Sequence, residues 1–470
     1  MTSYDIKTIQ MVETSVQSVS VTQALAKFVV GLNNPSNIPS AVTEKARVCL
    51  LNGYGIALAC FDTPYAPVAA RASIAIDGER PDGATMFIDG RKTSMFGAAL
   101  ANGALFHGRA QEDACGAAHL GAILIPLLTA AVETGKMPID RMLNALIAGY
   151  EVGGLFETNY APHTTPVGIR ASAIYGSLSA AAAAAYALNL DEEQTAAALA
   201  NAASFSGGLL QSFEDGTDEW RYQLGIAARN GWVSAELARA GSVSAPFAIE
   251  GKNGFVRAYA RTECKAPELI GQIGKTWFIH RVVFKPYPVC AFNQTPVNAG
   301  LSLREKLNGR KPVRMEVHMN PYETGYAGMD SQGPFHSVSG TLMSIPFCIA
   351  NTMLYGAPTM KNMMVFDDPA VLELINKIKL VPDSSVSRLC CVIDAKLDDG
   401  STLTETMNKT IDDYNYDRAQ LKDLIIRVCA EVGVGPEAFD VLSKFVDDPK
   451  AVGIQTVQNC FASLRKQVGK

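Results

Sequence analysis

The pattern of apolar and polar positions divides the chain into a long helical part and a later part that contains strands. Apolar residues recur at the i, i+3, i+4 spacing of an amphipathic helix over Thr22–Leu32 and Val42–Leu58. The runs Gly121–Thr134 and Met142–Phe156 are richer in apolar residues, which indicates helices buried on more than one side. We therefore expect a helical domain over residues 21–268.

One helix of this domain has an unusual composition. The run Gly176–Leu190 begins with Gly-Ser-Leu-Ser and continues with six alanines. Because its side chains are small and mostly apolar, we expect a central helix packed on several sides. Asp191 and Gln194 have the spacing of a capping box, which predicts the start of the next helix.

The pattern of residue types changes from helical to strand-like after Thr276. Phe278–Tyr287 is rich in β-branched and aromatic residues and predicts a strand, and Val313–Met319 alternates like a half-buried strand. Ser387–Leu397 and Ser401–Met407 flank Asp398-Asp399-Gly400, a turn that favours positive φ, so they predict a β-hairpin. The helices expected in this part are Asn293–Leu307, Gly340–Leu354 and Pro369–Ile378.

These patterns predict a multidomain protein with a large all-helical domain and a smaller α+β domain. We expect a flexible tail over residues 1–20, the helical domain over 21–268 and the α+β domain over 269–412. Helices over 413–470 are expected to pack back on the helical domain. Because the strands do not alternate regularly with helices, we do not expect a doubly wound sheet.

Composition narrows the classes of partner. The 470 residues have a net charge of −5 and no basic stripe, so we expect no nucleic-acid binding. The ten cysteines form no CxxC pair, and the first twenty residues are too polar for a signal peptide, which favours the cytoplasm or another reducing compartment. No apolar run is long enough to predict a membrane span, and no P-loop or GxGxxG motif indicates a nucleotide cofactor.

Two of the six histidines, His107 and His119, flank Glu112 and Asp113 in a polar insert between two apolar helices. A carboxylate and an imidazole beside a helix end suit proton transfer to or from a carbon acid. The alternative is a loop with solvated charges. Asp113, Cys115 and His119 are zinc-ligand types, but no second cluster with metal spacing follows, so we expect no metal.

Three later segments offer further candidates. Arg170 is expected at the start of the alanine-rich helix, where free N–H groups and a guanidinium make an anion site. Trp220-Arg221 follows a dense acidic turn, and Lys285 leaves an expected strand into a proline-locked turn that holds it rigidly. For each of these segments the alternative is an ordinary surface loop, helix start or strand end.

Taken in order, the four segments resemble the recurring motifs of the MmgE/PrpD family. That family includes 2-methylcitrate dehydratases, cis-aconitate decarboxylases and iminodisuccinate epimerases, and the resemblance extends from about Val21 onward. It implies a large helical domain formed by both chain ends, a smaller α+β lid and an active site between them. It also implies a homodimer, no metal and no organic cofactor.

The resemblance also implies the site residues. His107, Asp113, His119, Arg221, Lys285, Tyr287 and Cys290 match the motifs, and Glu112 keeps an acidic position. Ala110, Ala114, Leu120, Arg170, Trp220 and Gln294 depart from them. The residues expected to be catalytic are His119, as proton carrier, with Asp113, His107 and Tyr322. Those expected to bind substrate are Arg170, Arg221, Lys285, Trp220, Tyr287 and Gln294.

The departures change the expected chemistry. An arginine does not act as a base near neutral pH, and a tryptophan does not transfer protons. We therefore expect a pocket rebuilt for a substrate with fewer carboxylates or with an apolar or ring part. The leading hypothesis is a lyase, either a dehydratase or a decarboxylase, that acts on a small carboxylate-bearing substrate. An isomerase or epimerase and a catalytically inactive binding homologue are the alternatives.

Overall fold

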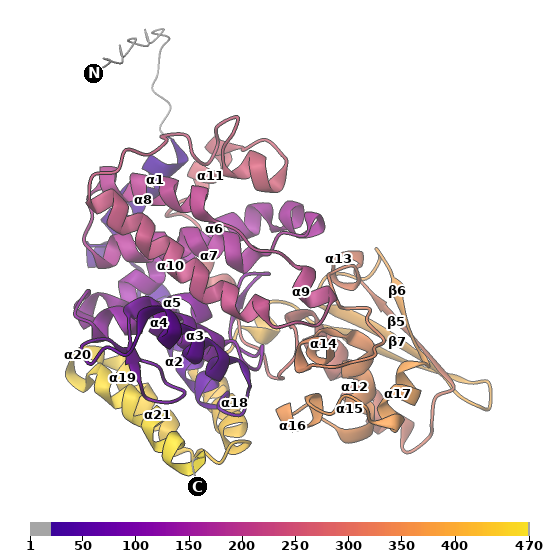
Figure 1. Ribbon diagram of the computed structural model, residues 1–470. Coiled ribbons are helices and arrows are strands. Elements are labelled where there is room, and N and C mark those ends of the chain that lie inside the picture. Colours follow the sequence, from indigo (N-terminus) through magenta and orange to yellow (C-terminus); the bar gives the residue numbers. More distant parts are fainter. Residues whose placement is uncertain (1–19, 469–470) are drawn as a thin grey trace.

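The computed structural model describes residues 20–468, which form a helical domain and a smaller domain that contains a sheet (Figure 1). The tail expected over residues 1–20 lies outside the described residues except for Ser20. The Ser20 hydroxyl accepts the Gln23 N–H, and the Gln23 side chain accepts the Ser20 N–H, so a capping box starts the first helix. Within the described chain, every helix is too short or too polar to cross a membrane.

The helical domain is built around α7 (Ala171–Ala187), every residue of which is buried. The predicted central helix of small residues is thus confirmed, as is the capping box at Asp191 and Gln194. Close packing depends on α10 (Glu219–Arg239), where a Cβ added at Gly231 would lie 2.4 Å from the Ala180 Cβ. The other helices of this domain are α1 (Val21–Gly31), α2 (Ser40–Leu58), α3 (Tyr65–Asp77), α4 (Met95–Phe106), α5 (Gly121–Glu133), α6 (Met142–Thr164), α8 (Glu192–Phe205), α9 (Gln211–Glu214), α10 (Glu219–Arg239) and α11 (Ala266–Gln272).

The smaller domain contains a four-stranded sheet of order β6-β5-β7-β8, in which β5 and β6 are parallel and the other neighbours antiparallel. The predicted hairpin is confirmed, and Gly400 in its turn has a φ of 82°. The strands are β5 (Arg314–Met319), β6 (Ile378–Pro382), β7 (Cys390–Lys396) and β8 (Thr402–Asn408). The helices are α12 (Gln294–Leu307), α13 (Pro321–Thr324), α14 (Val338–Met343), α15 (Ile345–Tyr355), α16 (Met360–Met363) and α17 (Pro369–Ile375).

The C-terminal helices lie against the helical domain, where the yellow helices border α2 in Figure 1. Helices α18 and α19 pack on α2, and α21 contacts α2 and α5. Leu421, Leu424 and Phe445 belong to the same apolar core as the N-terminal helices. The bounds of these helices are α18 (Arg418–Ala430), α19 (Glu437–Asp447), α20 (Pro449–Val452) and α21 (Ile454–Val468).

The strand predicted over Phe278–Tyr287 is mostly absent, and this prediction was wrong. Its first part is a 3-10 turn, because the oxygens of the buried Glu151 carboxyl group accept the N–H groups of Phe278 and Ile279 at 2.9 Å each. Only β4 (Val282–Val283) is a strand, and it pairs with β3 (Ala114–Cys115) of the helical domain. The segment therefore packs into the helical core, later in the chain than the expected boundary at residue 269.

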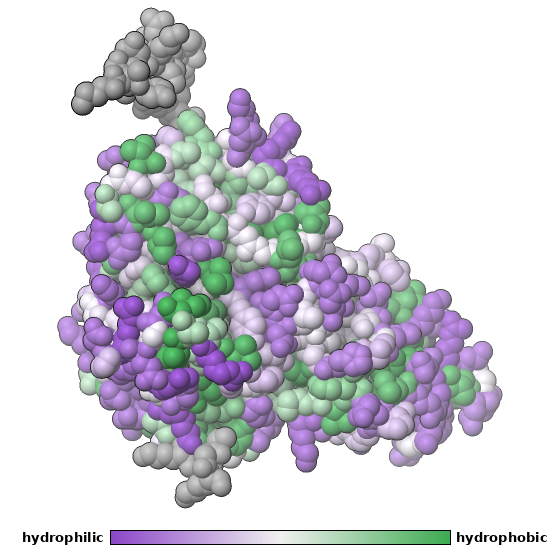
Figure 2. Space-filling view, in the orientation of Figure 1, coloured by the Kyte–Doolittle hydropathy of each residue, from purple (hydrophilic) through white to green (hydrophobic). Residues whose placement is uncertain are grey.

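Some apolar side chains remain on the surface of the helical domain. Figure 2 shows hydrophobic residues gathered over the region of the front face where α3 and α4 lie in Figure 1. On α3, Val68 is 42% exposed and Ile76 is 74% exposed. Exposed apolar surface of this kind is typical of protein–protein contacts. The homodimer implied by the family resemblance stays a prediction.

Candidate active site

The loop between α4 and α5 meets the segment that carries Lys285. Strands β3 and β4 pair antiparallel, with Ala114 opposite Val283. His107 directly follows α4, and His119 lies just before α5. The pairing of β3 with β4 thus brings Lys285 to the polar insert, where it contacts Glu112 across 173 positions of sequence.

Glu112 is the centre of a buried cluster of charged and titratable groups. Its Oε2 lies 2.8 Å from His107 Nδ1, and its Oε1 lies 3.0 Å from His119 Nδ1 and 2.6 Å from Lys285 Nζ. Burial alone would raise the pKa of Glu112, but His107, Lys285 and His119 together hold that pKa well below its usual value. Glu112 is therefore a carboxylate near neutral pH, and Lys285 supplies the compensating charge.

His119 has the arrangement of a proton carrier. Its Nδ1 lies 3.1 Å from the Asp113 carbonyl oxygen, which only accepts hydrogen bonds, so the proton of the neutral ring is on Nδ1. Its Nε2 has no hydrogen-bond partner among the described residues, and the side chain is 15% exposed. Burial and the positive charge of Lys285 hold the pKa of His119 well below its usual value. The ring is therefore neutral near pH 7, with an available lone pair.

His107 is enclosed more completely than His119. It has no exposed surface, and burial lowers its pKa to about 3 although Glu112 opposes this shift. Its Nε2 lies 2.9 Å from a terminal nitrogen of Arg170, and its ring packs edge-on against Trp220 at 4.5 Å. A histidine in this environment orients its neighbours more readily than it exchanges protons with a substrate.

Asp113 turns away from the Glu112 cluster. Its carboxylate accepts a hydrogen bond from Tyr150 and lies where a Cβ added at Gly121 would meet it at 2.5 Å. Burial raises the pKa of Asp113 to about 6, although the Tyr150 hydrogen bond works against this shift. Asp113, expected to be catalytic, thus contributes its backbone carbonyl to the site, and the carboxylate in the cluster is that of Glu112.

Arg170 and Arg221 are buried and already engaged with the protein. Arg170 precedes α7 as expected, and its terminal nitrogens donate to the Trp220 carbonyl, to Gln223 Oε1 at 3.3 Å and to His107. Arg221 lies between two aromatic rings, 3.5 Å from the centre of Tyr65 and 3.8 Å from that of Trp220. It also donates to Ser339 Oγ at 2.5 Å and to the Gly108 carbonyl at 3.4 Å. Both arginines were expected to bind substrate anions, but each of their terminal nitrogens already donates to a protein acceptor.

Tyr287 and Gln294 hold the proline-locked turn after Lys285. The Gln294 side chain accepts the Tyr287 N–H at 3.1 Å and donates to the carbonyls of Tyr287 and Val289 at 3.0 Å each. The Tyr287 hydroxyl donates to Asn298 at 3.1 Å. In these contacts the two residues shape the turn that presents Lys285.

The same turn is held from outside by residues of the polar insert and of α18. Gln111 Nε2 and Arg427 both donate to the Pro286 carbonyl oxygen, at 2.9 and 2.7 Å. The insert is itself tied to α18, because Arg109 lies 2.8 Å from the Glu431 carboxylate. The C-terminal helices therefore support the position of Lys285.

A cavity of about 450 Å³ opens between the loops of the helical domain and those of the smaller domain. Tyr322, expected as a second acid or base, lines this cavity, and its hydroxyl lies 3.5 Å from Thr165 Oγ1. Tyr326 also lines it, and its ring begins an aromatic series with centroid spacings of 5.9 Å to Phe213 and 4.9 Å from Phe213 to Trp220. Since Trp220 packs on His107, this series of rings lies between the cavity and the Glu112 cluster, whose residues are not among the described residues that line the cavity.

The atoms of His107, Glu112 and His119 that could bind a metal ion all lie within 4.8 Å of one another. Two cations already engage these atoms, because Lys285 lies 2.6 Å from Glu112 Oε1 and Arg170 donates to His107 Nε2. A divalent ion would be repelled by both cations. The cluster therefore suits proton transfer better than metal binding, and a metal-free site stays a prediction.

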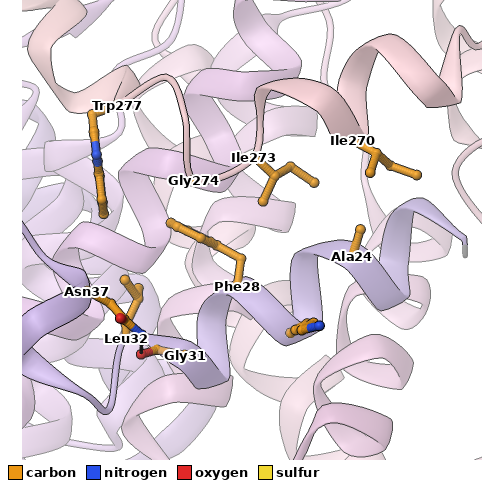
Figure 3. Close-up of a pocket in the computed structure, with 10 residues that line it drawn as sticks. Ala24, Phe28, Gly31, Leu32, Asn37, Ile270, Ile273, Gly274 and Trp277 are labelled. Carbon is orange, nitrogen blue, oxygen red and sulfur yellow. Dashed lines mark hydrogen bonds between the residues drawn. The ribbon is translucent and has the colours of Figure 1, made fainter.

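A second hollow, between α1 and α11, contains none of the expected site residues. It has a volume of about 430 Å³, and in Figure 3 Phe28 lies between Leu32 and Ile273 with Trp277 beside it. The described residues that line it include no carboxylate and no imidazole, and only Lys27 carries a charge. This hollow offers no group for proton transfer to or from carbon.

Two residues of the site, Glu112 and Tyr326, were not among the site residues predicted from the sequence. Glu112 could have been chosen from its position between the two histidines, but the direction of its side chain depends on the fold. Tyr326 lies four residues after Tyr322, beyond the end of α13, and no motif in the sequence marks it. The residues that the structure does gather around Glu112 are His107, His119, Lys285, Arg170 and Trp220.

Comparison with known proteins agrees with this architecture. The MmgE/PrpD N-terminal domain matches residues 23–267, and the MmgE/PrpD C-terminal domain matches residues 287–420. A cis-aconitate decarboxylase-like protein, oryM, of Aspergillus oryzae (strain ATCC 42149 / RIB 40) is 27% identical over 83% of this chain and 86% of its own length. An alkylcitrate dehydratase, phiI, of Fungal sp. (strain ATCC 74256) is 24% identical over 86% of each chain. With both of its domains matched over most of its length, the protein belongs to the MmgE/PrpD family.

Proposed function

We propose that the protein is a lyase that moves a proton next to a carboxylate or carbonyl of a small organic acid. The observation that carries this proposal is the state of His119. Its Nδ1 is held by the Asp113 carbonyl and the Glu112 carboxylate, while Nε2 has no partner among the described residues. A neutral imidazole fixed in this way is a general base with one available nitrogen.

The proton moves as follows in each lyase reaction. In a dehydration, His119 Nε2 takes a proton from the carbon next to the carboxylate, the C–H electron pair forms the double bond, and the hydroxyl leaves as water after it is protonated. In a decarboxylation, the neutral His119 Nε2 first takes the proton of the substrate carboxyl group; carbon dioxide then leaves, and the electron pair left on carbon takes this proton from His119. Lys285 supplies positive charge within the same cluster, which favours an enolate-like intermediate.

The hydroxyls of Tyr322 and Tyr326 are the candidates for protonating the leaving group. Both line the cavity, and burial raises the pKa of each, so both are protonated near neutral pH. The names of the two relatives favour a lyase over an isomerase, since one is a decarboxylase-like protein and the other a dehydratase. No cofactor is part of the proposed reaction.

The experiment is incubation with a panel of small carboxylic acids in deuterated water, followed by NMR and mass spectrometry. A lyase puts deuterium on carbon and yields a product lighter by water or carbon dioxide. Exchange with unchanged product mass would indicate an isomerase instead. An acid that binds without any exchange would indicate an inactive homologue. His119→Ala should abolish the reaction, whereas His163→Ala, at an exposed histidine at the end of α6, should not.

A further inference from the structure

We infer that Arg170 and His107 are positioning residues, which fix the Glu112 carboxylate against His119 rather than bind the substrate. The two terminal nitrogens of Arg170 donate to three protein acceptors: the Trp220 carbonyl, Gln223 and His107. The residue is 1% exposed. A substrate carboxylate would have to displace these bonds to reach the same nitrogens, and buried acceptors would then be left without a donor.

The hydrogen bond from Arg170 determines which nitrogen of His107 carries the proton. A guanidinium only donates hydrogen bonds, so His107 Nε2, at 2.9 Å, must accept. The proton of the neutral ring is then on Nδ1, the atom 2.8 Å from Glu112 Oε2. Arg170 thus turns the protonated Nδ1 of His107 toward Glu112, where the 2.8 Å contact is electrostatic, since neither His107 Nδ1 nor Glu112 Oε2 has an aligned hydrogen-bond partner among the described residues.

The surroundings of His107 keep this arrangement in place. The Trp220 ring packs edge-on against the His107 ring at 4.5 Å, and the Trp220 backbone carbonyl accepts from Arg170. The groups that face His107 are two cations, Arg170 and Lys285, and one anion, Glu112, with His119 5.0 Å away between ring centres. A second proton on His107 would place a buried cation beside Arg170, so the ring stays neutral.

These contacts divide the two oxygens of Glu112 between two tasks. Oε2 faces His107 at 2.8 Å without another partner among the described residues, and Oε1 faces His119 and Lys285. Without His107 or Arg170, Lys285 alone holds the carboxylate through Oε1, and rotation about this contact can move Oε1 out of line with His119. The result would be a misoriented base with its substrate contacts intact, as when a residue that orients a catalytic histidine is lost.

The first test measures the tautomer of His107 directly and needs no substrate. In protein labelled with ¹⁵N-histidine, the six histidines are assigned by single substitution, and long-range ¹⁵N–¹H spectra report which ring nitrogen is protonated. We expect His107 to be neutral, with its proton on Nδ1, from pH 5 to 8. In Arg170→Met it should become a mixture of tautomers. A His107 protonated on Nε2, or one that titrates in this range, would overturn the inference.

The second test uses activity and therefore rests on the proposed lyase function. In His107→Gln the side-chain amide can accept from Arg170 and donate to Glu112 but cannot titrate, so most of kcat should be kept. His107→Leu and Arg170→Met should lose kcat by about 10- to 100-fold with little change in KM. Arg229→Met, at an exposed arginine of α10, is the matched control.

Two activity results would contradict the inference. A His107→Gln enzyme as inactive as His107→Leu would make His107 a proton carrier, and a rise in KM at constant kcat in Arg170→Met would make Arg170 a substrate ligand. Circular dichroism and melting curves identify variants that fail to fold. If the wild-type protein moves no proton from any acid, the proposed function fails, but the NMR result still decides the tautomer of His107.

Discussion

Lys285 Nζ lies 2.6 Å from Glu112 Oε1, and both side chains are almost fully buried. The contact joins the polar insert of the helical domain to the turn that leads into the smaller domain. A buried ion pair of this kind contributes little net stability while it is intact, but the loss of one partner leaves an unpaired charge in the interior. The same contact therefore matters both for folding and for the charge around His119.

Glu112→Gln should destabilise the protein by about 3 to 5 kcal/mol, because Lys285 then has no counter-charge. The free energy of unfolding in urea measures this effect. Combining the substitution with Lys285→Met should recover part of the loss. Glu373→Gln is the control, since Glu373 pairs with Lys377 on the surface, and it should leave the unfolding curve unchanged. A Glu112→Gln protein as stable as wild type would show that Glu112 is not the partner of Lys285.

The Pro286 carbonyl offers a second test of how Lys285 is held. Arg427 of α18 donates to this oxygen at 2.7 Å, and its loss removes a charge-assisted bond worth about 1.5 to 3 kcal/mol. We expect Arg427→Met to lower kcat by about tenfold, because a turn that is held less firmly presents Lys285 less accurately. Lys422→Met, on the same helix, should keep full activity. An unchanged kcat in Arg427→Met would show that Gln111 alone fixes the turn.

The fold was predictable where its signals were local. Asp191 and Gln194, within four residues, predict the start of a helix, and Asp398-Asp399-Gly400 predicts a hairpin turn. The strand expected after Thr276 was wrong because the structure of this segment depends on Glu151. The Glu151 side chain accepts two N–H groups of the segment and lies more than a hundred positions earlier in the chain. Strand β6 was not predicted, since its parallel partner β5 lies far away in the chain and only its first residue, Ile378, fell within the expected helix.

The site was predictable as a set of segments but not as a set of contacts. Motif order identified His119 and Lys285, which the fold brings to one carboxylate. It could not separate Glu112 from Asp113, because adjacent side chains in a loop have no periodicity to direct them. The role of Arg170 depends on a backbone carbonyl fifty residues later in the chain, which no local pattern reveals.

Glu151 makes stability depend on pH. Burial raises its pKa from 4.5 to about 8, although the N–H groups of Phe278 and Ile279 oppose the shift. Between these values the folded state binds more protons than the unfolded state, so the stability contributed by Glu151 is fully present below pH 4.5 and is lost as pH rises through 8. The slope from this one group is at most about 1.4 kcal/mol per pH unit.

Glu151→Gln should flatten this decline, because the amide does not ionise. Urea unfolding at several pH values between 5 and 9 measures the difference between the variant and wild type, which isolates Glu151 from the other buried carboxyls. Glu192→Gln, at an exposed position in the first turn of α8, is the control. Parallel stability curves for wild type and Glu151→Gln would contradict the raised pKa.

Trp220 has a buried indole N–H without a hydrogen-bond partner among the described residues. Leaving a buried donor unpaired costs about 1 to 3 kcal/mol, and a substrate oxygen would satisfy it. Trp220→Phe keeps most of the ring packing but removes the donor, so KM should rise by about tenfold at similar kcat. Trp277→Phe, in the hollow between α1 and α11, is the control. An unchanged KM would leave Trp220 with a packing role only.

The charges around Glu112 also limit how many carboxylates the substrate can carry. Lys285 is paired with Glu112, and Arg170 and Arg221 donate to protein acceptors, so the interior offers few cations for added anionic groups. A carboxylate buried without a partner is costly, so a second or third carboxylate should not tighten binding. Calorimetry with acids of similar size that carry one, two or three carboxylates measures this. Binding of a tricarboxylate tenfold tighter than that of a monocarboxylate would mean that the arginines exchange their protein acceptors for substrate.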